Sequence, residues 1–258
     1  MANTSRTIAI VNQKGGVGKT TTTINLAAAL CLKGQSVLVI DMDPQGNAST
    51  GLAISRKHRG TSIYDVLVEG TCMREAIQPT SVPGLFIVPS HIDLSAAELE
   101  IGKASGRTTR LKSAVDKLNH DYDYVFIDCP PALGLLTVNA LAVANSALVP
   151  LQCEFYALEG LSQLLKTVEI AKDSINPNLA IEGVMLTMYD SRNRLSGQVA
   201  SDVRKHLGRA VFNTMIPRNV RIAEAPSFGK PAMMYDPHCS GAKAYVALAD
   251  ELLSRHKR

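Results

Sequence analysis

A short glycine-rich stretch near the amino end of the chain limits its fold more than any other feature. Residues 12–20 read Asn-Gln-Lys-Gly-Gly-Val-Gly-Lys-Thr. A strand-like apolar run over 7–12 leads into this stretch, and a helix-like run over 20–33 follows it. A strand, a glycine loop and a helix in this order form the local structure that a phosphate-binding P-loop requires.

The residue types of the loop predict a nucleotide site. Glycines let backbone N–H groups approach an anion, and the amino end of the next helix adds partial positive charge. We expect Lys19 to reach the β- and γ-phosphates and the Thr20 hydroxyl to coordinate Mg²⁺. The predicted nucleotide-binding residues of the loop include Gly15, Gly16, Val17, Gly18, Lys19, Thr20 and Thr21.

The loop departs from the usual P-loop in one respect. The common pattern has a glycine five residues before Gly18, where this chain has Gln13, and a second lysine, Lys14, comes next. Lys14 has two interpretations: a solvated surface lysine, which is the usual state of this residue type, or a cation directed at phosphate oxygens, including those of a second subunit. The loop by itself does not decide between them.

The order of apolar segments predicts an α/β fold. Strand-like runs alternate with helical patterns along the chain, which is typical of a doubly wound, mostly parallel sheet flanked by helices. Ligands of such sheets bind at the carboxyl ends of the strands. The predicted strands are 7–12, 36–41, 85–89, 123–128, 146–151, 180–187 and 211–216. The predicted helices are 20–33, 62–69, 93–103, 107–119, 134–143, 157–173, 195–207 and 241–256, and 44–61 is expected to be a long loop or short helix near the site.

Length and composition are consistent with one such domain over residues 1–258. The five cysteines are scattered without a Cys-x-x-Cys pair, so neither a zinc site nor a redox motif is indicated, and a reducing, cytoplasmic location is expected. No secretory signal precedes the first predicted strand. The most apolar region, 132–151, is interrupted by Asn139, Asn145 and Pro150, which favours a buried helix and strand over a membrane span.

Positive charge is concentrated in the last third of the chain. Residues 183–258 carry 12 basic and 6 acidic side chains, against 15 and 17 in residues 1–182. A basic surface attracts polyanions, nucleic acid above all. Ordinary solubilising charge is the alternative explanation.

Two predicted strands end in carboxylates. Asp41 and Asp43 follow an apolar run, and because residues two apart in a strand share a face, both are candidates for a Mg²⁺–phosphate centre. Asp128 ends the run Tyr-Val-Phe-Ile, a Walker B pattern, and is expected to hold Mg²⁺ through water. The absence of an Asn-Lys-x-Asp tetrapeptide favours ATP over GTP. Because no glutamate follows Asp128 to act as a general base, slow hydrolysis is expected.

These motifs together resemble the ParA/Soj family of deviant Walker ATPases, in its short, chromosomal type. The resemblance covers essentially the whole chain, and the segments that carry it are 13–20, Asp-Met-Asp-Pro-Gln-Gly-Asn at 41–47, 128–131, Met-Tyr-Asp-Ser-Arg at 188–192, and 216–231. It implies an ATP-sandwich homodimer in which Lys14 reaches the partner's phosphates and Gly15 and Gly16 lie in the interface. It also implies that Asp43 positions the attacking water, that Asp41 lies near the metal, and that Pro217 and Asn219 contact adenine.

The resemblance further implies a cycle on DNA. The ATP-bound dimer would bind double-stranded DNA on the nucleoid without sequence preference, and a ParB-type partner would stimulate hydrolysis and release it. The cargo, chromosome or plasmid, stays open. The basic residues within or beside the family motifs are Arg192, Arg218, Arg221 and Lys230, and Arg192 and Arg221 are the favoured phosphate contacts.

Three alternatives belong to related or neighbouring classes. A MinD-like membrane-cycling ATPase would end in an amphipathic helix with bulky apolar residues opposite lysines, whereas the apolar residues of 245–258 are small and few. An iron–sulfur reductase or carrier would need paired cysteines, and Cys129 is the one cysteine near the predicted site. A metabolic kinase would need a second-substrate pocket, which no motif indicates.

Overall fold

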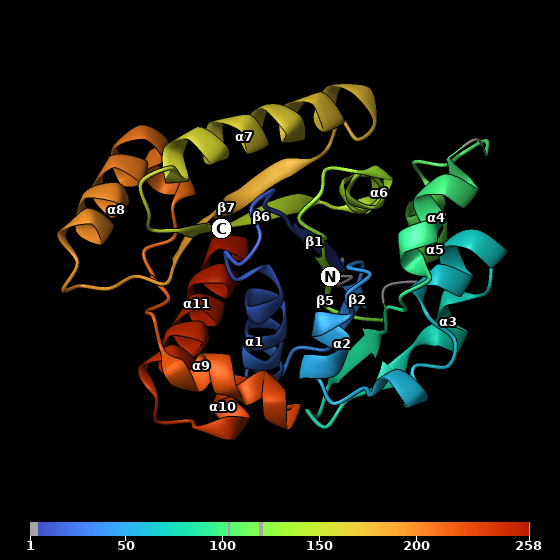
Figure 1. Cartoon of the computed structure of the whole chain (residues 1–258), viewed down its shortest axis with the longest axis horizontal. Helices are drawn as coiled ribbons and strands as arrows, with labels where there is room; N and C mark the ends of the chain where they lie inside the picture. The colour runs from blue at the N-terminus through green and yellow to red at the C-terminus, as the bar shows by residue number, and fades with distance from the viewer. Residues whose placement is uncertain (1–4, 103, 119–120, 258) are drawn as a thin grey trace.

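One β-sheet forms the centre of the molecule. The computed structural model describes residues 5–102, 104–118 and 121–257. Within these residues, seven strands lie in the order β3-β4-β2-β5-β1-β6-β7 (Figure 1). Every neighbouring pair is parallel except β3 with β4, so the predicted mostly parallel fold is confirmed. The strands are β1 Arg6–Ile10, β2 Val37–Asp41, β3 Gln78–Pro79, β4 Leu85–Val88, β5 Tyr124–Asp128, β6 Ser146–Gln152 and β7 Ala180–Thr187.

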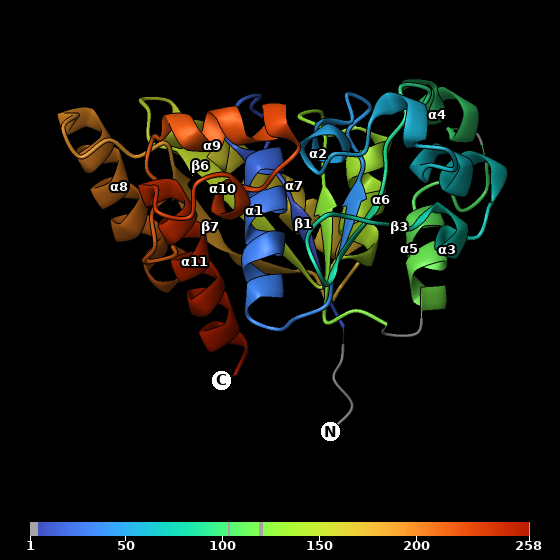
Figure 2. The same cartoon turned by 90° about the horizontal axis from the view of Figure 1, so that it is seen from below.

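Helices cover both faces of the sheet. α1 and α11 pack on one face with Leu26, Leu30 and Leu248, and α6 and α7 lie on the other with Leu141 and Leu164 (Figures 1 and 2). β2 and β5 are buried at every residue, which explains their continuous apolar sequences. The helices are α1 Lys19–Leu32, α2 Asn47–Gly51, α3 Met73–Ala76, α4 Leu94–Ile101, α5 Arg110–Val115, α6 Leu135–Val143, α7 Ala157–Ser174, α8 Arg194–Leu207, α9 Val220–Glu224, α10 Ala232–Tyr235 and α11 Ser240–His256.

The long predicted helices are confirmed with shifts at their ends. Residues 103 and 119, the predicted ends of two helices, lie outside the described residues. The helix expected at 62–69 is a π-helical turn over Asp65–Glu69. α2 lies within 44–61, where a loop or short helix was expected, whereas the short helices α3, α9 and α10 were not predicted.

The predicted strand at 211–216 is wrong. This segment runs beside β7 but forms one isolated bridge, Val184 with Val211; a second bridge, Tyr189 with Pro217, lies just beyond its end. Side chains form hydrogen bonds with backbone groups of this segment that would bond to a neighbouring strand if the segment were itself a strand. Arg204 donates to the carbonyls of residues 212 and 213, Arg255 donates to that of Val211, and the Glu251 carboxylate accepts the N–H groups of residues 213 and 214.

The strand order places the candidate site. β1 lies between β5 and β6. The strands β2 to β5 all lie on one side of β1, and β6 and β7, which come later in the chain, lie on the other side. The loops after β1, β2 and β5 therefore meet at one edge, which is the upper edge in Figure 2, near α2 and α9. A crevice at the carboxyl ends of parallel strands, where the strand order reverses, is the usual ligand position in such folds.

Candidate nucleotide-binding site

The P-loop joins β1 to α1 and is fixed by side chains from neighbouring strands. Asn12 donates to the Pro150 carbonyl at 2.7 Å and accepts the N–H of Lys14 at 3.0 Å. Thr187, at the end of β7, donates to the carbonyl of Val17 at 2.8 Å. The Val17 side chain is buried, so it anchors the loop while the backbone on either side faces outward.

Two glycines of the loop have conformations that other residues rarely adopt. Gly16 and Gly18 have φ values of +75° and +95°, and Gly18 is the residue that precedes the first turn of α1. These left-handed positions turn the chain around the start of the helix. The loop thus presents backbone N–H groups and a helix amino end at one place, as an anion site requires.

The two lysines of the loop lie in different environments. Lys19 is buried, and its ammonium donates to the carbonyl of Lys14 at 3.1 Å. Burial lowers the pKa of Lys19, while the negative charges of Asp128 and Asp43 oppose that shift. Lys14 is about half exposed, and its ammonium contacts the carboxylate of Glu154, which follows β6. Only Lys19 therefore belongs to the interior of this site.

Asp128 and Asp41 end adjacent strands and are direct neighbours in the register of β2 and β5. Both are fully buried. The hydroxyl of Thr23 donates to the Asp128 carboxylate at 3.0 Å, yet the Oδ2 atom of Asp128 has no hydrogen-bond partner among the described residues. Burial raises the pKa of Asp128, and the charge of Asp41 adds to the shift.

These groups fit a hydrated magnesium ion. An unpartnered, buried carboxylate oxygen beside a threonine hydroxyl is a suitable donor set, because Mg²⁺ prefers oxygen ligands and keeps several of its waters. Thr20 and Asp128, two of the three residues predicted for the metal, are the residues that would hold the ion. A bound Mg²⁺ would supply charge neutralisation at the phosphates.

Asp41 and Asp43 have different surroundings, although both were candidates for a Mg²⁺–phosphate centre. Asp41 accepts the N–H and hydroxyl of Ser49 at 2.8 and 2.7 Å and the N–H of Asp43 at 3.2 Å. Burial raises the pKa of Asp41, while the hydrogen bonds from Ser49 oppose the shift. These contacts tie Asp41 to α2. Asp43 lies beyond the end of β2 and borders the open cavity.

A cavity of about 520 Å³ lies over the loop. Its lining combines P-loop residues with the loop after β2 and includes Gly15, Gly16, Gly18, Lys19, Thr20, Thr21, Asp43, Gln45, Asn47, Thr50, Pro131 and Met188. A second space of about 180 Å³ shares Gly18, Thr21 and Met188 with it and is lined by Pro217, Asn219 and Tyr245. The predicted phosphate and adenine residues are therefore brought together, although they are about two hundred positions apart in the sequence.

The Asn219 side chain is already engaged within its own chain. Its oxygen accepts the N–H groups of Arg221 and Ile222 at the start of α9, and its nitrogen donates to Ser240. Any contact of Asn219 with a base would therefore use its backbone. Met188 has φ +50° at the junction of the two spaces; it begins the 188–192 motif but was not predicted to line the site.

The predicted DNA-contact residues lie on two neighbouring stretches of the chain, the loop after β7 and residues 218–230. Arg218 donates its N–H to the carbonyl of Tyr189, which places it beside the loop that carries Arg192. Arg192 is exposed and pairs with Asp190 at 3.0 Å, and its bonds lower the pKa of Asp190, with a smaller effect from Arg218. Arg221 pairs with Glu224 at 2.9 Å and with Asp236 at 3.6 Å. Lys230 is exposed after Gly229.

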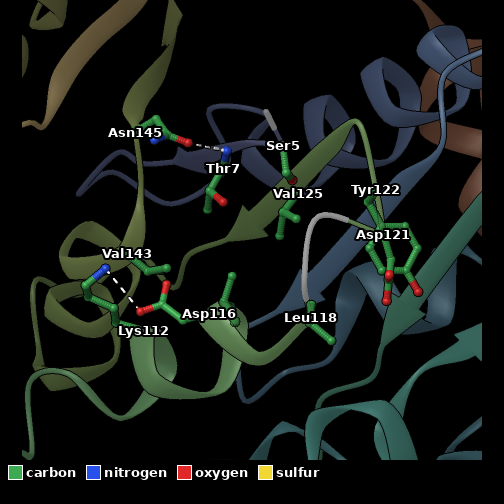
Figure 3. A pocket seen from close by; sticks show the side chains of 11 residues that line it. Ser5, Thr7, Lys112, Asp116, Leu118, Asp121, Tyr122, Val125, Val143 and Asn145 are labelled. Atoms are coloured by element: carbon green, nitrogen blue, oxygen red, sulfur yellow. Dashed lines mark hydrogen bonds and ion pairs between the residues drawn. The ribbon is translucent and has the colours of Figure 1, made fainter. Parts of the chain in front are cut away.

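A further cavity, of about 340 Å³, lies at the opposite end of the strands (Figure 3). Thr7 and Asn145 line it from β1 and from the residue before β6, and Lys112 and Asp116 pair at 3.3 Å across its side. It is separate from the loops that form the nucleotide cavity.

Comparison with known proteins shows the family of this chain. A family model described as an AAA domain matches residues 5–181. The chain is 55% identical over 258 residues to the chromosome partitioning protein ParA of Caulobacter vibrioides, covering 99% of this chain and 97% of that protein. It is 50% identical over 245 residues to the sporulation initiation inhibitor protein Soj of Bacillus subtilis, covering 95% and 97%.

The chain belongs to the ParA/Soj family. A solved structure of cobyrinic acid a,c-diamide synthase from Mycobacterium smegmatis with bound ADP and magnesium has the same fold, with a TM-score of 0.86 at 37% identity over 98% of this chain and 96% of that one. Family membership, together with the P-loop and the acidic ends of β2 and β5, makes this ParA/Soj protein an ATPase with ATP and Mg²⁺ as its cofactors.

Proposed function

We propose that this protein is an ATP-dependent dimeric switch in DNA segregation. Two copies would enclose ATP between them, and the dimer would bind double-stranded DNA without sequence preference. A ParB-type partner would stimulate the slow hydrolysis that releases the DNA. The relatives named for chromosome partitioning, at up to 55% identity over nearly the whole chain, support the segregation role.

The observation that carries the dimer is the separation of the two loop lysines. Lys19 is buried beneath the loop and donates to the Lys14 carbonyl, so a cation is already placed for the phosphates of its own nucleotide. The Lys14 side chain, at the start of the loop, is half exposed and contacts Glu154. A cation at that position is suited to the phosphates of a nucleotide bound by a second copy.

The outer glycines of the loop support the same arrangement. A Cβ atom built on Gly15 or Gly16 would meet no described atom within 4 Å. Gly15 does not have a positive φ, so neither backbone conformation nor crowding within its own described chain requires glycine there. A smooth backbone surface allows close approach of another backbone, which is what a shared phosphate site needs.

For hydrolysis, Asp43 is the proposed residue that orients the attacking water. It borders the same cavity as Lys19 and Thr20. Its Oδ1 atom accepts the N–H of Gln45 at 3.0 Å, which limits the rotation of the carboxylate. Asp41 is bound to Ser49, so we assign it to the support of this loop, near the metal centre.

The proposed DNA surface lies on the basic C-terminal third of the chain. Arg192 is the most accessible candidate, since its side chain is 88% exposed. Arg218 lies on the adjacent segment, and Lys230 is exposed beyond α9. Arg221 has two carboxylate partners in its own chain and would have to exchange them for DNA phosphates. A dimer presents this surface twice, which couples dimer formation to DNA affinity.

The membrane-cycling alternative receives no support from α11. Tyr245, Leu248 and Leu252 of this helix are buried in the cluster that also contains Leu26 and Leu30 of α1. Among the helices of the described residues, none has the length and apolar character needed to cross a bilayer. Pelleting with anionic liposomes in the presence of ATP tests this alternative directly.

DNA binding measured with ATP, with ADP and without nucleotide, over a series of salt concentrations, tests the switch. We expect strong binding with ATP only. The logarithm of the DNA-binding constant falls linearly with the logarithm of the salt concentration. In the Arg192→Ala variant this line should be less steep by about one unit of slope for each DNA phosphate that the variant no longer neutralises. Lys172→Ala, which removes an exposed charge from α7, is the matched control. Equal DNA binding in all nucleotide states would contradict the proposal.

A further inference from the structure

A buried arginine lies behind the loop that carries Asp43. Arg59 follows the turn Arg56–His58 and is 2% exposed. Among the described residues, no carboxylate oxygen lies within 4.0 Å of its guanidinium, and its Nε atom is buried without a hydrogen-bond partner. Burial of a cation without an ion pair is costly. This position therefore calls for a reason other than packing.

The guanidinium joins the ends of two neighbouring strands. Its Nη1 atom donates to the carbonyl of Ser90, just beyond β4, at 3.0 Å. Its Nη2 atom donates to the carbonyl of Gly46 at 3.0 Å and to the hydroxyl of Thr50 at 2.8 Å. Arg59 thus fixes the loop after β2 to the frame of the sheet.

The Gly46 carbonyl is the point at which this loop is held. It also accepts the N–H and the hydroxyl of Thr50, both at 3.0 Å. Gly46 in turn donates its N–H to the carbonyl of Asp43 at 2.8 Å. The contact from Arg59 therefore reaches Asp43 through one residue. Gln45 and Thr50, which line the nucleotide cavity, belong to the same short loop.

Glycine at position 46 is matched to the arginine. Gly46 has φ +62°, and a Cβ built there would lie 2.0 Å from Nη1 of Arg59. A side chain at 46 would displace the guanidinium. On the other side of the loop, Ser49 bonds Asp41 and accepts the N–H of Ser90, so the loop has two fixed points.

We propose that Arg59 is a positioning residue for ATP hydrolysis, which holds the backbone of Gly46 and thereby sets the place of Asp43 against the nucleotide. The inference rests on the role proposed above for Asp43. Arg59 donates no hydrogen bond to the described residues of the P-loop or to the segment around Pro217. The chemical step should therefore depend on Arg59, whereas ATP affinity should not.

The test compares Arg59→Met and Arg59→Lys with Arg56→Met, an exposed arginine of the same turn. ATP affinity is measured with a fluorescent ATP analogue, hydrolysis by single turnover, and folding by thermal melting. Displacement of a catalytic group lowers the rate by about tenfold to a hundredfold. The kcat of Arg59→Met should therefore be at least about tenfold lower than that of the wild type, whereas its ATP affinity should change by less than about threefold. Arg59→Lys keeps the buried charge but cannot reach all three acceptors, so it should fold and still show reduced kcat.

A double-mutant cycle separates positioning from a general loss of stability. Gly46→Ala should reproduce the fall in kcat, and the Gly46→Ala, Arg59→Lys pair should lose little more than either change alone. A kcat of Arg59→Lys and Arg59→Met equal to that of the wild type would overturn the inference, and so would a parallel loss of ATP affinity.

Asp43→Ala, assayed alongside, distinguishes the two proposals. Wild-type hydrolysis by Asp43→Ala would show that the role given to Asp43 is wrong. An inactive Asp43→Ala together with fully active Arg59 variants would show that only the positioning role of Arg59 is wrong.

Discussion

Lys14 and Glu154 form an ion pair between the P-loop and the segment after β6. The two residues meet because β6 lies next to β1, so the chain leaving β6 passes beside the loop. The Lys14 side chain is 53% exposed and that of Glu154 is 31% exposed. In a single copy, the lysine proposed to reach a partner's phosphates is therefore bound to a carboxylate of its own chain.

Glu154→Gln should make ATP-dependent dimerisation easier, because Lys14 no longer has to leave a carboxylate. Exposed ion pairs contribute at most about 1 kcal/mol each. Because two such pairs open when a symmetric dimer forms, the dimer dissociation constant should fall by up to about thirtyfold. Sedimentation with a non-hydrolysable ATP analogue measures this change. Glu159→Gln, an exposed acid in the first turn of α7, is the control. Unchanged or weaker dimerisation would show that Glu154 does not compete for Lys14.

Lys19→Ala should abolish ATP binding. Lys19 is the buried cation of the loop; its ammonium donates to the Lys14 carbonyl, and the charges of Asp128 and Asp43 favour its protonated form. Isothermal titration with ATP and Mg²⁺ measures the loss. Lys33→Ala removes a surface lysine that pairs with Asp250 and should bind ATP normally. Retained affinity in Lys19→Ala would mean that the phosphates lie elsewhere.

The parts of the fold that were predicted correctly are those whose information is local. β2 and β5 are buried on both faces, so their apolar runs mark them directly. The segment 211–216 was predicted from the apolar residues at both of its ends, but Arg204, Arg255 and Glu251 take up its backbone groups. Those three side chains come from other helices, and nothing within the segment itself indicates them.

The same distinction applies to the site. Gly18, Lys19 and Thr20 are adjacent, and their spacing predicts their placement beside one another. Arg59 belongs to the run Arg-Lys-His-Arg at 56–59, which has the composition of a solvated turn. Its burial results from contacts with Gly46 and Ser90, which lie 13 and 31 positions away. Likewise, Glu154 becomes the partner of Lys14 only through the pairing of β6 with β1.

Asp128→Asn should stabilise the nucleotide-free protein and remove its response to Mg²⁺. Burial and the charge of Asp41 raise the folded-state pKa of Asp128, so its contribution to stability is full at low pH and is lost as pH rises through that pKa. An asparagine side chain does not ionise, so its contribution to stability does not fall as the pH rises. Its oxygen can still accept a hydrogen bond from the Thr23 hydroxyl. In thermal melts over a pH series, the melting temperature of Asp128→Asn should therefore increase relative to that of the wild type as the pH rises.

The same melts repeated with ATP and Mg²⁺ test the metal role of Asp128. The wild type should gain stability and Asp128→Asn should gain little, because a ligand stabilises only the state that binds it. Asp116→Asn, an exposed acid paired with Lys112, should behave like the wild type. A full response of Asp128→Asn to Mg²⁺ would exclude this carboxylate as a holder of the ion.

Glu182 fastens the end of α11 to the amino ends of the strands. His256 bonds Glu182 at 2.8 Å and Tyr124 at 2.9 Å, and Ser146 donates to Glu182 at 2.6 Å. Burial opposes ionisation of Glu182, but the bonds from His256 and Ser146 outweigh it, and the pKa of Glu182 lies below its usual value of 4.5. The stabilisation is therefore present above pH 4.5 and is lost as pH falls through the lowered pKa.

Glu182→Gln should consequently unfold at lower urea concentration than the wild type near neutral pH, and the difference should narrow as the pH falls below 4.5. Urea unfolding followed by circular dichroism at several pH values measures both effects. Glu169→Gln, an exposed change on α7, should leave the acid profile unaltered. A difference between Glu182→Gln and the wild type that did not vary with pH would mean that poorer packing, and not the charge of Glu182, accounts for it.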